Sequence, residues 1–364
     1  MYGLIYGLTV ILIFDYRIIP RRAFFLFWFI IMVFLSFSIR WGMIEEAIYT
    51  SNSQVWGDIG SYSYNMALES PFISYHLREP IFWVGSRLLY KVIGNFGLVF
   101  VVMDVVLFLT FYKSIELLQS FFPKHIKLHN AQYLYFAAFL VYPYIVGMHN
   151  YYRQILGVTI AICAMGLADK KLGKALFIFL ISILVHNATI LLFPIILLVK
   201  KYNIFYCLIV IAALTIIFNL FMSYAPNYIV PTYFISEVSR RFYETTLTVD
   251  VFNTRTLIYA SLLFLLTFFV ILSEYLAKSR ENFILIKVLF FLNLVYLFSL
   301  LFFPNNLVAS RIFFMVLTLI FILIGLYIEN RFKPIQISRL LYFHLSLVPL
   351  LGLRGDGLYY YFGS

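Results

Sequence analysis

Two apolar runs, YLYFAAFLVYPYIVGM (133–148) and ILGVTIAICAMGLA (155–168), are separated by the polar hexapeptide HNYYRQ (149–154). Each run, with its apolar neighbours, approaches the roughly 20 residues that a helix needs to cross a bilayer. The hexapeptide between them is short enough to be a simple turn between two spans. Runs of this kind recur along the whole sequence, and they predict an all-α, polytopic integral membrane protein.

The composition agrees with insertion into a membrane. Of the 364 residues, 63% are hydrophobic and only 12% are charged, whereas about a quarter of the residues in soluble domains are charged. The formal net charge of +11 therefore concerns how Lys and Arg are sorted across a membrane, and it does not indicate nucleic acid. Cys163 and Cys207 both lie in apolar runs, which argues against a disulfide framework or a metal site. We interpret MYGLIYGLTV (1–10) as part of a first short helix, because it has no basic segment and no cleavage site after it.

Hydropathy predicts about 11–12 transmembrane segments in one membrane-embedded domain, residues 1–364. Residues 174–199 differ from the other segments, because His186 and Asn187 interrupt them near the middle. Each half is too short to span comfortably, so we expect a broken helix hairpin there. The other predicted spans are about 2–14, 23–39, 96–115, 131–148, 152–168, 203–223, 256–276, 283–303, 308–328 and 338–353.

The positive-inside rule orients these spans, because short basic connections are cytoplasmic. It leaves two external loops, about 40–95 and 224–255, in which we expect short amphipathic helices such as EPIFWVGSRLLYKVIG (79–94). HNYYRQ is also external. Eleven of the twelve lysines are then cytoplasmic, but nine of the fifteen arginines are external. Since topology does not explain these arginines, we expect some of them to bind phosphate or carboxylate, which Arg recognises through two parallel hydrogen bonds.

Three spans that enter the membrane from outside begin with similar chemistry. They start at HNYYRQ, at NTRT (253–256) and at PNNLVASR (304–311), each with an Asn as candidate N-cap and an Arg near the first turns. A helix N-terminus presents its positive dipole end and N–H groups, so an Arg there favours an anionic ligand such as phosphate. His149 and Arg153 are four residues apart, a spacing that places them on one helix face. The alternative is that the Asn caps are ordinary and that the arginines contact lipid headgroups.

Two ionisable residues, His186 and Asp104, lie deep within predicted membrane segments, where such groups are functional candidates. His186 is either a functional group or a hydrogen-bonded structural residue at a helix break. We expect Asp104 to face the interior of the helix bundle, with a partner that the sequence does not identify.

The motifs GDIGSY (57–62), REPIFW (78–83), YYRQILGVTIAI (151–162), LVHNATILLFP (184–194) and ASRIFFM (309–315) occur in an order that resembles the EpsG family. This family is related to the O-antigen polymerases called Wzy. The resemblance covers about residues 35–320 and implies a GT-C-like membrane glycosyltransferase architecture. The chain departs from the family pattern in two places: Ile59 follows Asp58 where a Tyr is usual, and Arg40 lies further upstream of Asp58.

The resemblance implies a processive polysaccharide polymerase at the external face of the bacterial inner (cytoplasmic) membrane, with no cofactor. The enzyme would transfer the growing glycan from undecaprenyl diphosphate to a sugar hydroxyl of an incoming lipid-linked unit. Its implied partners are undecaprenyl-diphosphate-linked glycans, the lipid bilayer, a flippase and a chain-length regulator, and they include no nucleic acid. The alternatives are a flippase or other transporter, an O-antigen ligase and a membrane O-acyltransferase. The external position of the arginines favours an enzyme over a transporter.

A predicted site follows from this reaction. Negative charge develops on the diphosphate leaving group, so external arginines would stabilise the transition state. The candidate diphosphate ligands are Arg153, Arg311, Arg255, Arg40 and Arg78, with Gln154, Asn150 and His186 as supporting residues. The attacking hydroxyl needs a proton acceptor, for which the candidates are His149, Asp58 and Glu79. We expect no metal ion, because no external carboxylate cluster or His pair has metal-ligand spacing.

Overall fold

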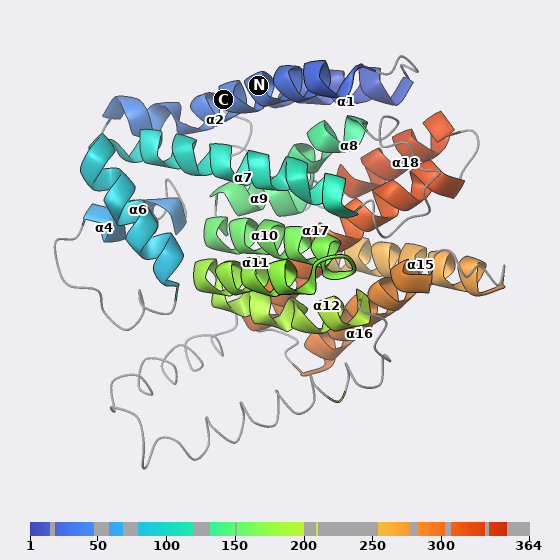
Figure 1. Cartoon of the computed structure of the whole chain (residues 1–364). Coiled ribbons are helices and arrows are strands. Elements are labelled where there is room, and N and C mark those ends of the chain that lie inside the picture. The colour runs from blue at the N-terminus through green and yellow to red at the C-terminus, as the bar shows by residue number, and fades with distance from the viewer. Residues whose placement is uncertain are drawn as a thin grey trace, which may run out of the picture. The chain divides into compact units, whose positions relative to one another are not determined.

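The computed structural model describes most of the chain, and every regular element in the described part is a helix (Figure 1). No strand occurs in that part, which confirms the all-α prediction. The described residues are 1–14, 19–46, 58–67, 79–118, 132–149, 151–199, 209, 254–276, 283–302, 307–331 and 335–347.

Three helical segments of the described residues are long and apolar enough to cross a membrane: Arg21–Glu45, Phe96–Leu118 and Ile312–Glu329. Several shorter apolar helices accompany them, among them Tyr2–Phe14 and Tyr152–Ala168. Large apolar side chains of the first segment are exposed, as expected for a surface that faces lipid. These features are those of a polytopic membrane protein.

Helices occupy most of the predicted spans. The predicted span at 203–223 lies outside the described helices, so it stays a prediction. The matching helices are α1 (Tyr2–Phe14), α2 (Arg21–Glu46), α7 (Phe96–Leu118), α10 (Tyr152–Ala168), α15 (Thr254–Leu276), α16 (Phe283–Phe302), α17 (Leu307–Arg331) and α18 (Ile335–Leu347).

The predicted span at 131–148 is helical but is not one continuous helix. The segment consists of α8 (Gln132–Ala137), a 3-10 turn (Ala138–Leu140) and α9 (Tyr142–His149), with Val141 in an extended conformation between them. Pro143 accounts for the interruption, because a proline fits the first turn of a helix but not its interior. All residues from 132 to 141 are buried, so the broken segment lies among other helices.

The predicted break inside residues 174–199 is confirmed. Helix α11 (Leu172–Val185) ends before His186, whose backbone is extended with φ −150° and ψ 110°. A 3-10 turn (Asn187–Leu192) follows, and then α12 (Phe193–Val199), which has Pro194 in its first turn. His186 is the C-cap of α11: its N–H still bonds the Ser182 carbonyl at 2.9 Å, and the helix does not continue beyond it.

The chain divides into two compact units. The first contains Met1–Thr189 and Thr318–Ser364, and the second contains Ile190–Leu317. In the second unit α16 packs against α12 and α15, and Thr267 donates a 2.9 Å hydrogen bond to Asn293 between α15 and α16. The interpretation of residues 1–364 as a single domain stays a prediction.

Helix α10 is central to the first unit and packs against α7, α9 and α11. Two glycines permit its close contacts, in the manner of small residues between membrane helices. A Cβ on Gly166 would lie 2.6 Å from the backbone of Leu117 in α7, and a Cβ on Gly157 would lie 2.9 Å from the Cβ of His186. Gly157 therefore allows the start of α10 to lie against the helix break.

Two short helices from the predicted external loop pack beside α10. They are α4 (Asp58–Ala67) and α6 (Pro80–Ile93), and α6 also contacts α7 and α11. Helix α6 ends at Gly94, whose positive φ of 73° allows its N–H to bond the Tyr90 carbonyl at 2.7 Å. Arg87 of α6 donates to the Asn65 carbonyl of α4 at 3.0 Å, which joins these two helices. The predicted amphipathic helix at 79–94 is therefore present.

Candidate functional site

The carboxylate of Glu79 joins three parts of the first unit. Glu79 is the residue before α6 and is only 4% exposed. Its Oε2 forms an ion pair with Nη1 of Arg153, at the start of α10. Its Oε1 lies 2.7 Å from Nδ1 of His186 and accepts a 3.3 Å hydrogen bond from the backbone N–H of Asn187. Loop, helix start and helix break thus meet at one carboxylate.

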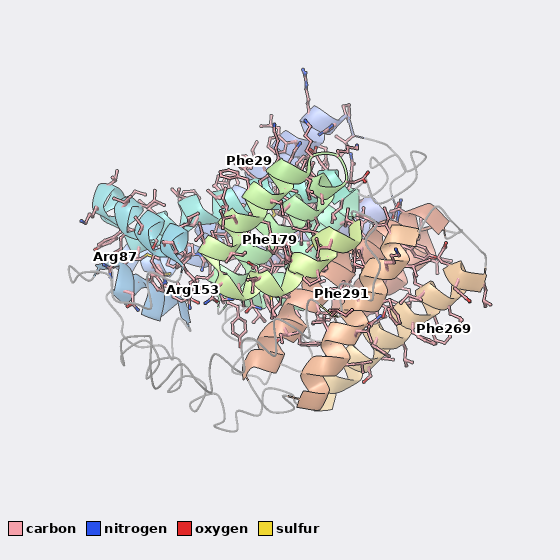
Figure 2. The ribbon with its side chains drawn as sticks, turned by 60° about the horizontal axis from the view of Figure 1, so that its bottom comes forward. Phe29, Arg87, Arg153, Phe179, Phe269 and Phe291 are labelled. Atoms are coloured by element: carbon pink, nitrogen blue, oxygen red, sulfur yellow. The ribbon has the colours of Figure 1, made fainter. Side chains whose placement is uncertain are left out.

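Arg153 is enclosed by aromatic rings as well as paired with Glu79. Its guanidinium carbon lies 5.0 Å from the ring centre of Tyr62, 5.2 Å from Trp83 and 5.9 Å from Phe82. We call these three residues the aromatic box. They contact one another edge to face, with ring centres 5.1–5.8 Å apart. Figure 2 shows Arg153 where α10 meets α4 and α6, and Arg87 among those two helices. Cation–π contacts of this kind stabilise a cation that has left bulk water.

Local hydrogen bonds fix the helix break that carries His186. The His186 carbonyl accepts bonds from the backbone N–H of Thr189 at 3.0 Å and from its hydroxyl at 2.8 Å. Ser182 donates to the same hydroxyl at 2.8 Å, and the His186 N–H bonds the Ser182 carbonyl at 2.9 Å. Because the backbone on both sides is held, the direction of the imidazole is set before any ligand arrives.

The electrostatics of the site keep Glu79 ionised. Burial raises the pKa of its carboxyl, but the hydrogen bond with His186 and the positive charge of Arg153 outweigh this and lower the pKa to about 2. Glu79 is therefore a carboxylate at neutral pH, and a carboxylate only accepts hydrogen bonds. Consequently Nδ1 of His186 carries the proton in this contact.

A second buried cluster lies around Arg40 of α2, which is 2% exposed. Its guanidinium donates to both oxygens of Asp104 at 3.1 and 3.2 Å, and to the Met148 carbonyl at 2.8 Å. Ser36 also donates to Asp104, at 2.6 Å. The partner of Asp104 that the sequence left unidentified is therefore Arg40. This pair holds the end of α9, and with it the start of HNYYRQ.

His149 belongs to this second cluster and not to the Glu79 site. Its Nε2 lies 3.5 Å from the Tyr2 hydroxyl. Burial and the charge of Arg40 lower the pKa of His149 to about 3. The expectation that His149 and Arg153 share one helix face is wrong, because α9 ends at His149 and α10 begins at Tyr152. The N-cap of α10 is Tyr151 rather than Asn150.

The structure thus brings together three of the predicted site residues: Arg153, Glu79 and His186. Gln154 follows Arg153 in α10 and is buried at 2% exposure. The remaining candidates are placed less completely. Three candidates have a described backbone but no described side chain: Asp58 in α4, Arg255 in α15 and Arg311 in α17. Two more, Arg78 and Asn150, lie wholly outside the described residues.

Sequence reasoning missed the aromatic box. Its signal was present, because Phe82 and Trp83 come two and three residues after Pro80, at the start of α6. Tyr62 lies four residues after Asp58 in α4, a spacing that places both on the same helix face. Aromatic residues in an external loop of a membrane protein are usually attributed to the membrane interface, and nothing in their spacing indicated an arginine between them.

Among the residues that the structure describes, no three His, Cys, Asp or Glu side chains lie close enough to hold a metal ion. Positive charge in the described site comes from Arg153, and negative charge from Glu79.

Comparison with known proteins identifies the family of this chain. The family model of the EpsG family matches residues 46–353, which is most of the chain. The matched residues include the helix starts, the helix break and every residue of the Glu79 site. No curated protein and no solved structure matches this chain.

Proposed function

The chain belongs to the EpsG family of Wzy-like polysaccharide polymerases, and from this premise we propose that it polymerises lipid-linked oligosaccharide repeat units at the external face of the bacterial cytoplasmic membrane. The donor is the growing glycan on undecaprenyl diphosphate. The acceptor is a single lipid-linked unit, which attacks through a sugar hydroxyl. A flippase supplies the unit to this face, and a chain-length regulator limits the product.

The observation that carries the proposal is the position of Arg153. It lies at the start of α10, where the helix N-terminus and the guanidinium both favour an anion. It is held by Glu79 and by the aromatic box, so its direction is fixed. A diphosphate leaving group gains negative charge as its bond to the sugar breaks. A preorganised cation stabilises this charge without reorganisation at the moment of reaction.

The predicted topology supports an external active site. The start of α10 and the loop with α4 and α6 fall on the side with few lysines, and a lipid-linked glycan presents its diphosphate at that membrane boundary. Arg255 and Arg311, near the starts of α15 and α17, belong to the second compact unit, and their role as diphosphate ligands stays a prediction from the sequence. Arginine supplies the positive charge, so the proposed reaction needs no metal ion.

The proposal is tested by supplying the purified full-length chain, in proteoliposomes, with lipid-linked repeat units extracted from source cells that lack its gene. We expect a ladder of glycans of increasing length on a gel, together with release of undecaprenyl diphosphate. Transfer of one glycan to a different acceptor without elongation would instead indicate a ligase. Movement of a labelled unit to the other leaflet without elongation would indicate a flippase. Either of these results contradicts the proposal.

A further inference from the structure

The two oxygens of Glu79 have different partners, and this division has a chemical consequence. Oε2 pairs with Arg153, whereas Oε1 contacts Nδ1 of His186 at 2.7 Å. One carboxylate therefore connects the proposed phosphate-binding cation to an imidazole. All three side chains are buried, with exposures of 4–8%, so their interactions are weakly screened by solvent.

The carboxylate determines which nitrogen of His186 is basic. Because Glu79 is ionised, Nδ1 holds the proton of the neutral ring, and the lone pair that accepts a further proton is on Nε2. A carboxylate behind an imidazole fixes this tautomer and stabilises the imidazolium that forms when Nε2 gains a proton. These are the roles that a buried Asp has behind the His of a Ser-His-Asp triad.

The backbone around His186 also suits a positioned base. The ring projects from a break that Ser182 and Thr189 hold with hydrogen bonds of 2.8–3.0 Å. Gly157, one turn after Arg153 in α10, leaves the space in which the Cβ of His186 lies. The imidazole and the guanidinium are thus fixed relative to each other through α10 and through Glu79. A base and a charge-stabilising group held in this way need little ordering in the transition state.

We propose that His186 is the general base of the reaction and that Glu79 is its positioning residue; this inference rests on the proposed function above. Nε2 of His186 takes the proton of the attacking sugar hydroxyl, and that oxygen forms the bond to the anomeric carbon of the donor glycan. The bond from this carbon to the diphosphate oxygen breaks, and its electron pair leaves with the lipid diphosphate beside Arg153. The imidazolium then releases its proton to water.

The sequence predicted His149, Asp58 and Glu79 as candidate proton acceptors and His186 only as a supporting residue, so assigning the base to His186 departs from that prediction. Glu79 accepts hydrogen bonds on both oxygens and has a pKa of about 2. It is therefore a weak base, and its role is to hold Arg153 and His186 in position. His149 lies in the cluster with Arg40, away from the contacts of Arg153. His186 is the imidazole that the structure places on the carboxylate paired with Arg153.

The test uses His186→Asn. The amide N–H₂ of Asn occupies the position of Nδ1–H and can donate to Glu79, but no atom of Asn accepts a proton as Nε2 does. We expect the variant to keep its unfolding midpoint and its affinity for undecaprenyl diphosphate in nanodiscs, while kcat for glycan elongation falls by roughly 100-fold or more. A kcat within about threefold of the wild-type value would overturn the assignment.

The pH dependence of kcat tests the role of Glu79. The charged groups described at the His186 ring and its carboxylate are Glu79 and Arg153. Without the carboxylate the imidazolium is less stable, so in Glu79→Gln the acidic limb of the pH–kcat profile moves to lower pH, whereas a purely structural role would leave the limb in place. In His186→Asn the limb is absent. If the wild type makes a ladder and His186→Asn is also active, only the assignment of the base is contradicted. If the wild type itself makes no ladder, both the proposed function and the assignment of the base are overturned.

Discussion

Replacing Glu79 by Gln tests the electrostatics of the site through stability. The carboxylate is 4% exposed and pairs with Arg153, which is 8% exposed. Removing its charge leaves a buried guanidinium without its anion, a change that costs about 3–5 kcal/mol in other buried pairs. The lowering of the Glu79 pKa from 4.5 to about 2 corresponds to about 3 kcal/mol, which is a similar magnitude. We therefore expect the free energy of unfolding to fall by about 3 kcal/mol at pH 7.

The pH dependence gives a sharper form of the same prediction. A carboxyl whose pKa is lowered by folding contributes stability that is fully present above its unfolded pKa and is lost as pH falls towards its folded pKa. For Glu79 this interval runs from 4.5 down to about 2. The difference in unfolding free energy between the wild type and Glu79→Gln should therefore shrink by about 3 kcal/mol across this interval.

The assay is equilibrium unfolding by sodium dodecyl sulfate in mixed micelles, at a series of pH values, for both proteins. Other acidic groups titrate in the same range, but they are common to both proteins and cancel in the difference. A difference that stays constant between pH 6 and pH 2.5 would refute the interpretation of Glu79 as an ionised, buried partner of Arg153 and His186.

Two further substitutions test how the chain positions the site. Gly157→Ala places a Cβ 2.9 Å from that of His186, so we expect about 1–3 kcal/mol of destabilisation and a lower kcat in the folded fraction. A Cβ on Gly173 would have no neighbouring atom within 4 Å, so Gly173→Ala should leave kcat unchanged. Equal kcat values for the two variants would contradict a close contact between Gly157 and His186. Asp104→Asn leaves Arg40 buried without its carboxylate, and should lower the unfolding free energy by about 3–5 kcal/mol. The exposed Asp169→Asn control should change it by less than about 0.5 kcal/mol, and similar losses in the two would argue against a buried pair.

Much of the fold followed from local pattern. The apolar runs predicted the helices, and the short halves on either side of His186 predicted the break. The helical hairpin of HNYYRQ was less predictable in detail, because hydropathy does not show where one helix ends and the next begins. His149 therefore lies at the end of α9 and not on a face of α10. In the same way, Pro143 divides a run that is apolar throughout.

The contacts of the site were harder to predict because they join distant residues. Glu79 and His186 are 107 positions apart, and Arg40 and Asp104 are 64 apart. The sequence identified each of these residues as unusual for its place, but periodicity carries no information about which of them meet. For this reason both Arg40 and Arg153 were predicted as diphosphate ligands, although the structure pairs the first with Asp104 and the second with Glu79.

The central claim is that the Glu79 site, with Arg153 as its cation, carries out glycan polymerisation. It is tested most directly by the length distribution of the polymer made by Arg153→Lys beside that made by Arg87→Lys. Both substitutions keep a positive charge and remove the planar fork of donors, and Arg87 serves as control because its described bond is to the Asn65 carbonyl of α4. We expect elongation by Arg153→Lys to fall on the order of 100-fold, while Arg87→Lys still makes the wild-type ladder. A wild-type ladder from Arg153→Lys would contradict the claim.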